Sequence, residues 1–188
     1  MAYNRLQTMR NNIEAIRVAF RLGVENRLPT DDDREALGKY AGFGGLKCIL
    51  NDANELADAA KWSKSDIELF APTVELRRLI HDYSKSDKEF AAYMDSLKAS
   101  VLTAFYTPSL VIDAIADSLK ANSIEVKSFL EPSAGQGAFV DSFLQRYPGA
   151  EALAFEKDLL TGKILSALHP SISTEIKGFE KIDPVNTH

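Results

Sequence analysis

Two acidic residues flank a glycine-containing loop at a spacing that suits a nucleotide-type ligand. Glu131 ends a short apolar stretch and precedes the loop at residues 133–137, and Glu156 follows that loop by about 20 residues. Glycines let a backbone come close to a ligand, and a carboxylate at the end of a strand accepts hydrogen bonds from ribose hydroxyls. These residues therefore predict the binding of a nucleoside-containing molecule.

The surrounding pattern predicts alternating strands and helices that would position these acids. Residues 127–131 and 151–155 are short apolar stretches typical of buried strands, and we expect a third strand over residues 174–179. Helices are expected between the strands, with Asp158 as the cap of the second. Because such strands are joined by right-handed crossovers, the expected fold class is α/β with a parallel, doubly wound, partial Rossmann-like sheet.

A threonine–proline pair precedes this α/β part. Thr107 suits the N-cap of a helix and Pro108 suits its first position. The apolar side expected for that helix consists of Leu110, Val111, Ala114, Ile115 and Leu119. Everything before it looks helical, so we expect a helical N-terminal region over residues 1–99 and a second domain over residues 100–188.

Three features stand out in the helical region. The first helix, expected over residues 4–22, carries Arg10, Arg17 and Arg21, but Glu14 lies among them, so we interpret this face as solvated ion pairs and not as a DNA contact. Thr30 is expected to cap a second helix, and the alanine-rich residues 51–62 are expected to form another. The glycine-rich residues 40–47 are interpreted as a structural turn because their spacing is not that of a phosphate loop.

Composition excludes several classes of protein. The 188 residues carry a net charge of -5, which argues against a basic nucleic-acid clamp. No stretch reaches the roughly 18 apolar residues of a membrane span, and no signal sequence is evident, so we expect a cytoplasmic protein. Cys48 is the single cysteine and His81 has no second ligand at metal spacing, so no metal site is expected.

The loop itself distinguishes two nucleotide chemistries. A dinucleotide site needs the third glycine of a GxGxxG pattern, but Ala138, Phe139 and Val140 follow Gly137. Glu131 would also repel a pyrophosphate, whereas it would attract the ammonium group of an amino acid. S-adenosylmethionine has a cationic amine, an adenosine ribose and no phosphate, so it is the cofactor that these residues favour.

Three motifs occur in the order found in one enzyme family. EPSAGQGAF at residues 131–139 resembles motif I of the amino-group DNA methyltransferases, especially the adenine-N6 class. AFYTP at residues 104–108 and AFEKD at residues 154–158 resemble the motifs on either side of it. YAGFGGL at residues 40–46 is similar to a segment ahead of the methylase part in large methylase-helicase fusion proteins of plasmids and conjugative elements.

The resemblance implies a set of cofactor-binding residues. Thr107 would lie near the methionine carboxylate, Glu156 would bind the ribose hydroxyls, and Phe155 or Lys157 would flank the adenine. Phe179, beside Glu180, would lie near the adenine amino group. The residues expected around the methionine amine and carboxylate are Glu131, Pro132, Ser133, Ala134, Gly135 and Gly137.

The family's catalytic loop is missing from the sequence. Adenine-N6 enzymes carry an Asn/Asp/Ser-Pro-Pro-Tyr/Phe loop that grips the target base, and none occurs before the sequence ends at His188, shortly after Asp183-Pro184. We therefore expect an N-terminal, cofactor-binding fragment without a catalytic residue, inactive by itself, whose DNA partner is contacted through the rest of a longer chain. The alternatives are a fragment of an RNA or protein-glutamine methyltransferase, or a non-enzymatic methylase-like interaction module. The helical region would be a lid, a spacer or a DNA-contacting arm.

Overall fold

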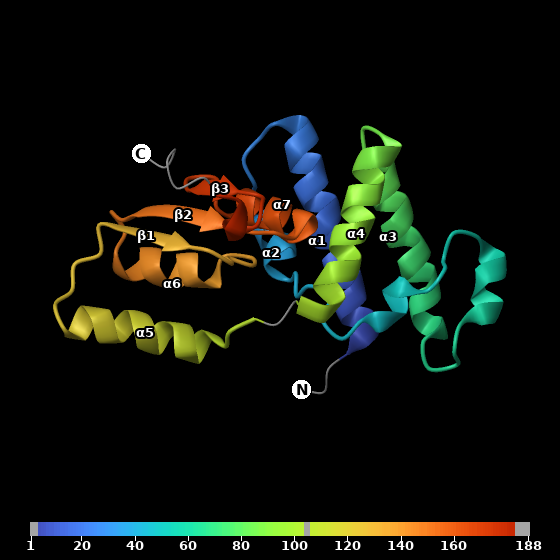
Figure 1. Ribbon diagram of the computed structural model, residues 1–188, viewed down its shortest axis with the longest axis horizontal. Coiled ribbons are helices and arrows are strands. Elements are labelled where there is room, and N and C mark those ends of the chain that lie inside the picture. The colour runs from blue at the N-terminus through green and yellow to red at the C-terminus, as the bar shows by residue number, and fades with distance from the viewer. Residues whose placement is uncertain (1–3, 104–105, 183–188) are drawn as a thin grey trace. The chain divides into compact units, whose positions relative to one another are not determined.

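The computed structural model describes residues 4–103 and 106–182, and the chain divides into two compact units, Met1–Ala104 and Phe105–His188 (Figure 1). Ala104 and Phe105 of the AFYTP motif and the Asp183-Pro184 pair lie outside the described residues. The boundary predicted between residues 99 and 100 falls inside a continuous helix, α4, Asp87–Thr103. Within the described ranges no helix is long and apolar enough to cross a membrane.

The first unit is helical. Its main α-helices are α1 (Arg5–Glu25), α3 (Phe70–Tyr83) and α4. Helix α3 packs on α1 and α4 packs on α3, while the short α2 (Asp31–Gly38) packs on α1. Met9, Ile13, Ile16 and Phe20 form a buried apolar side of α1. The Phe20 ring stacks on Tyr83 with centroids 5.0 Å apart and meets Tyr93 edge-on at 5.5 Å. The helix expected over residues 4–22 is therefore confirmed.

The start of α2 confirms the predicted cap. The Asp33 backbone N–H donates to the Thr30 hydroxyl at 3.2 Å, and the Thr30 N–H donates back to the Asp33 carboxylate at 3.0 Å. Arg27 and Arg21 also donate to Asp33, at 2.6 Å and 2.7 Å, and Arg27 in particular holds the pKa of this carboxyl well below its usual range. Arg17 binds Glu14 at 3.2 Å, so the predicted ion pairing is confirmed for Arg17 and Arg21.

The helix predicted over residues 51–62 is wrong. This stretch instead contains a single 3-10 segment, η2 (Leu56–Lys61), between the 3-10 segments η1 (Lys47–Leu50) and η3 (Ile67–Leu69). The Asp58 carboxylate accepts from the Asn54 N–H at 3.0 Å and from the Glu55 N–H at 3.3 Å. These side-chain bonds compete with helical backbone bonds, and the alanine content alone does not reveal them.

The glycine-rich turn after α2 is a packed structural element, as predicted. Its backbone is held by Asn12 of α1, whose amide donates to the Gly42 carbonyl at 2.6 Å and accepts from the Ala41 N–H at 2.8 Å. Gly42 and Gly45 have φ angles of 70° and 79°, which favour glycine, and Phe43 is completely buried. Asn12 is also fully buried, so the turn is anchored in the core of the first unit.

The second unit is a mixed α/β structure with a three-stranded parallel sheet. Its strands, β1 (Ser128–Glu131), β2 (Glu151–Phe155) and β3 (Ser173–Glu175), lie in the order β1-β2-β3. Two helices, α6 (Ala138–Arg146) and α7 (Leu159–Leu168), connect them, while α5 (Ser109–Ala121) precedes β1. The α/β class and the parallel sheet are thus confirmed, and β2 has its predicted bounds.

The third strand is shorter than predicted. It ends at Glu175, because the Lys177 N–H bonds back to the Glu175 carbonyl at 3.0 Å and turns the chain out of the sheet. Phe179, expected at a strand end, instead begins the 3-10 segment η4 (Phe179–Lys181).

One face of the sheet carries both connecting helices. Val140 of α6 and Leu165 of α7 form a buried cluster with Ala134 and with Ala154 of β2. Since side chains alternate along a strand, Leu130 and its register partner Leu153 project to the opposite face, where Leu130 is 47% exposed. The helices of this unit therefore cover the Ala154 face and leave Leu130 open.

The apolar side predicted for α5 is wrong. Leu110 is 79% exposed, and Val111 and Ile115 are also exposed, whereas Ile112 and Ala116 are buried toward α6, which lies between α5 and the sheet in Figure 1. Apolar residues occupy most positions of α5, so periodicity does not select one face. The orientation is fixed by α6, as a separate set of contacts shows: Arg146 binds Asp117 at 2.6 Å and Asp113 at 3.1 Å, and Ser142 donates to Asp113 at 2.8 Å.

Candidate functional site

The glycine loop lies at the carboxyl ends of β1 and β2. The Ala134 N–H donates to the Phe155 carbonyl at 2.8 Å, which ties the loop to the end of β2. Gly135 and Gly137 have φ angles of 57° and 102°, and the Gly137 N–H donates to the Ala134 carbonyl at 2.9 Å. Both glycines thus occupy the left-handed region, which explains why the loop needs them.

The two acids are bonded to backbone N–H groups of this loop. The Glu131 carboxylate accepts from the Ser133 N–H, directly after Pro132, at 3.0 Å. Glu156 is buried, with 9% of the residue exposed. Its carboxylate accepts from the Gly135 N–H at 2.8 Å and from the Asp158 N–H at 2.7 Å. Burial raises the pKa of Glu156, and these backbone bonds oppose that rise. The sequence correctly placed both acids beside the loop.

This arrangement is unfavourable for a phosphate. In phosphate-binding loops the backbone N–H groups point at the anion, whereas the Ser133 and Gly135 N–H groups already face the carboxylates of Glu131 and Glu156. The negative charge of these carboxylates favours a cationic group at the same place. The loop is therefore poorly suited to a pyrophosphate, as the sequence predicts.

Tyr106 covers the loop, and sequence reasoning did not assign it a role there. A Cβ built on Gly135 would lie 2.9 Å from a carbon of the Tyr106 ring, and the Tyr106 hydroxyl bonds to Thr161 of α7. Burial raises the pKa of Tyr106 to about 12, although 39% of the whole residue is exposed. Tyr106 thus contacts both the loop and α7 while part of the residue stays exposed.

Thr107 does not cap α5 as predicted. The helix begins at Ser109 with Pro108 as its N-cap, and the Pro108 carbonyl accepts from the Val111 N–H at 3.0 Å. Pro108 has a ψ of 139°, so it lies outside the helix and moves the helix start one residue beyond the predicted position. Thr107 is exposed, next to Tyr106.

The residues expected around an adenine form two pairs. The rings of Phe155 and Phe179 meet edge-on with centroids 5.5 Å apart, and Phe155 is buried while Phe179 is 45% exposed. Lys157 points to Glu180, with 2.9 Å between the ammonium and the carboxylate. The fold brings these four residues together beyond the end of β2, even though Phe179 is not at the end of a strand.

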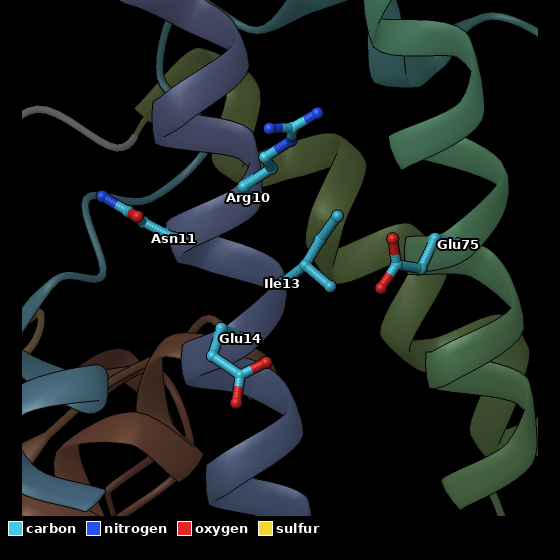
Figure 2. A pocket seen from close by; sticks show the side chains of 5 residues that line it. All are labelled: Arg10, Asn11, Ile13, Glu14 and Glu75. Atoms are coloured by element: carbon cyan, nitrogen blue, oxygen red, sulfur yellow. The ribbon is translucent and has the colours of Figure 1, made fainter. Parts of the chain in front are cut away.

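A separate hollow of about 370 Å³ lies on the first unit (Figure 2). Arg10, Asn11, Ile13 and Glu14 of α1 and Glu75 of α3 line it. The two carboxylates that line it, those of Glu14 and Glu75, both bind Arg17. In the part of the chain that the structure describes, no group of three or more His, Cys, Asp or Glu side chains is placed to hold a metal ion.

Comparison with known proteins gives one partial match. Over 81 residues the chain is 31% identical to Defense against restriction protein B of Escherichia phage P1. The match covers 43% of this chain and 4% of that protein. No family model matches the chain, and no solved structure matches it.

The assignment to the adenine-N6 DNA methyltransferase family is therefore wrong. The similarity found is to a protein named for defence against restriction, and no family model places this chain among methyltransferases or methylase-helicase fusions. Short motifs such as residues 131–139 are weak family markers, because a strand, a glycine turn and a helix recur at many sites that bind different ligands.

Proposed function

We propose that the second unit binds S-adenosylmethionine at the loop between β1 and α6. The observation that carries the proposal is the bonding of Glu131 and Glu156 to the Ser133 and Gly135 N–H groups, at 3.0 Å and 2.8 Å. Two carboxylates at the loop attract a ligand that combines positive charge with ribose hydroxyls and lacks phosphate. S-adenosylmethionine has these three properties.

The positions of the other residues extend this proposal. A carboxylate has about four acceptor positions, so Glu156 can keep its two backbone bonds and still accept from ribose hydroxyls. Glu131 would face the ligand ammonium and Thr107 its carboxylate. The Phe155–Phe179 pair and Lys157 would lie along the adenine.

We also propose that the three parallel strands belong to a Rossmann-like, doubly wound sheet. In such a sheet a second layer of helices would cover the face that carries Leu130. Leu130 is 47% exposed, as such an arrangement requires of an uncovered face. We assign no catalytic residue to this chain, and DNA stays a predicted partner.

Titration calorimetry of the purified chain tests the proposed ligand. We expect heat on addition of S-adenosylmethionine and none on addition of NAD. The carboxylates of Glu131 and Glu156 would repel the pyrophosphate of NAD. The Glu156→Gln variant should weaken binding on the order of 10- to 100-fold, the loss typical of a hydrogen bond to a charged group.

A matched control lies at the start of β2, the strand that Glu156 follows. Glu151 is exposed at the opposite end of β2, so Glu151→Gln changes the net charge equally but should leave the affinity unchanged. Equal affinities for the wild type and Glu156→Gln, or tighter binding of NAD than of S-adenosylmethionine, would refute the proposal.

A second candidate function follows from the 31% identity over 81 residues to a protein named for defence against restriction. We infer that this chain contributes to protecting DNA from restriction. Expression of the chain in a restriction-proficient host should raise the recovery of unmodified DNA above that of a host carrying an empty vector. Equal recovery in the two hosts, with the chain shown to be soluble, would argue against this function for the chain alone.

A further inference from the structure

A partly buried histidine contacts the glycine loop from the side of α7. His169 follows α7 as its C-cap, and its side chain is 11% exposed. Its Nε2 lies 3.3 Å from the Gln136 carbonyl oxygen, and its Nδ1 lies 3.7 Å from the Asp141 carboxylate of α6. One imidazole thus joins the end of α7, the glycine loop and the first turn of α6.

The loop is shaped around this ring. Gly137 has a φ of 102°, and a Cβ added there would collide with the His169 ring and come within 3.1 Å of Leu165. The imidazole therefore takes the space that a side chain at position 137 would need. Glycine at 137 and histidine at 169 are complementary in volume as well as in hydrogen bonding.

The peptide between Gln136 and Gly137 is held on both sides. Its carbonyl faces the His169 Nε2, which donates when that nitrogen carries a proton, and its N–H donates to the Ala134 carbonyl at 2.9 Å. One residue before this peptide, the Gly135 N–H donates to Glu156 at 2.8 Å. The orientation of this peptide therefore influences the bond between the loop and the buried carboxylate.

We infer that His169 is a positioning residue, which sets the shape of the glycine loop and through it the place of Glu156. The inference rests on the proposed function only where ligand affinity is concerned. Asp141 is the charged group that faces the ring from α6, the loop faces it with the Gln136 carbonyl, and α7 faces it with the apolar Leu165.

Two variants separate the hydrogen bond from the packing. His169→Leu keeps an apolar volume but removes the donor, whereas His169→Gln keeps an N–H donor at similar reach. In the free protein, amide hydrogen exchange at Gly137 and Gly135 should be on the order of tenfold faster in His169→Leu and close to wild type in His169→Gln, because one hydrogen bond is lost or kept. Exchange at Ala154, in the centre of the sheet, is the reference and should not change.

Ligand affinity is the second measurement. S-adenosylmethionine should bind on the order of tenfold more weakly to His169→Leu, with recovery in His169→Gln. Unchanged exchange at Gly137 in His169→Leu, or equal acceleration at Gly137 and Ala154, would overturn the positioning role. Because the exchange experiment needs no ligand, it decides the role of His169 even when the wild type fails to bind S-adenosylmethionine and the proposed function is refuted.

Discussion

Replacing Gly137 by alanine should destabilise the second unit by about 3 kcal/mol. The residue has a φ of 102°, which costs an L-residue roughly 1–2 kcal/mol. The new Cβ would also press on the His169 ring and on Leu165, and overpacking of a core typically costs about 1–3 kcal/mol. Urea unfolding followed by far-ultraviolet circular dichroism measures the change.

Gly149→Ala is the control for this experiment. Gly149 lies in the turn before β2, its φ is not in the left-handed region, and a Cβ there meets no atom within 4 Å. Its replacement should change the free energy of unfolding by less than about 0.5 kcal/mol, as for ordinary surface sites. A Gly137→Ala variant as stable as Gly149→Ala would contradict the fit between the loop and His169.

Replacing Asn12 by alanine should destabilise the first unit by about 3 kcal/mol. The substitution removes the donor that binds the Gly42 carbonyl and the acceptor that binds the Ala41 N–H. Asn12 is completely buried, so water cannot replace these bonds, and each unsatisfied buried group costs roughly 1–3 kcal/mol. Fluorescence of Trp62, the single tryptophan, follows the unfolding of this unit.

Asn11→Ala serves as the matched control, one residue away on α1. The Asn11 side chain accepts only from Gln7 at the exposed surface, at 2.8 Å among the described contacts, so its loss should cost less than about 0.5 kcal/mol. Asn12→Asp keeps the acceptor but turns a carboxylate oxygen toward the Gly42 carbonyl in a completely buried site, so it should destabilise the unit at least as much as Asn12→Ala. Equal unfolding midpoints for Asn12→Ala and Asn11→Ala would show that the turn does not depend on Asn12.

Features encoded in adjacent residues were predictable from the sequence. The strand β2 has its predicted bounds, and Asp158 caps α7 by accepting from the Thr161 N–H at 2.7 Å. Thr30 likewise forms the predicted cap with Asp33. In each case the residues that form the structure lie within a few positions of one another, so local patterns contain the necessary information.

Features decided by distant residues were missed. The buried side of α5 depends on Arg146, which lies beyond the next strand and binds Asp113 and Asp117. The contacts of His169 with Gln136 and of Tyr106 with Gly135 join residues far apart in the chain. No periodicity or spacing marks these pairs, because tertiary packing creates them.

The family assignment failed for a related reason. A strand, a glycine turn and a following acid describe the geometry of residues 131–156, and the structure has this geometry. The same geometry serves many ligands and many families, so it supports a binding site without identifying the family.

Mapping the ligand contacts by nuclear magnetic resonance tests the central claim most directly. On titration with S-adenosylmethionine, the proposal predicts that the backbone amides of Ser133, Gly135 and Glu156 shift together and saturably, while those around the hollow near Arg10 and Glu75 do not. No shift at Gly135 and Glu156 at millimolar S-adenosylmethionine, or shifts confined to the first unit, would contradict the proposed site.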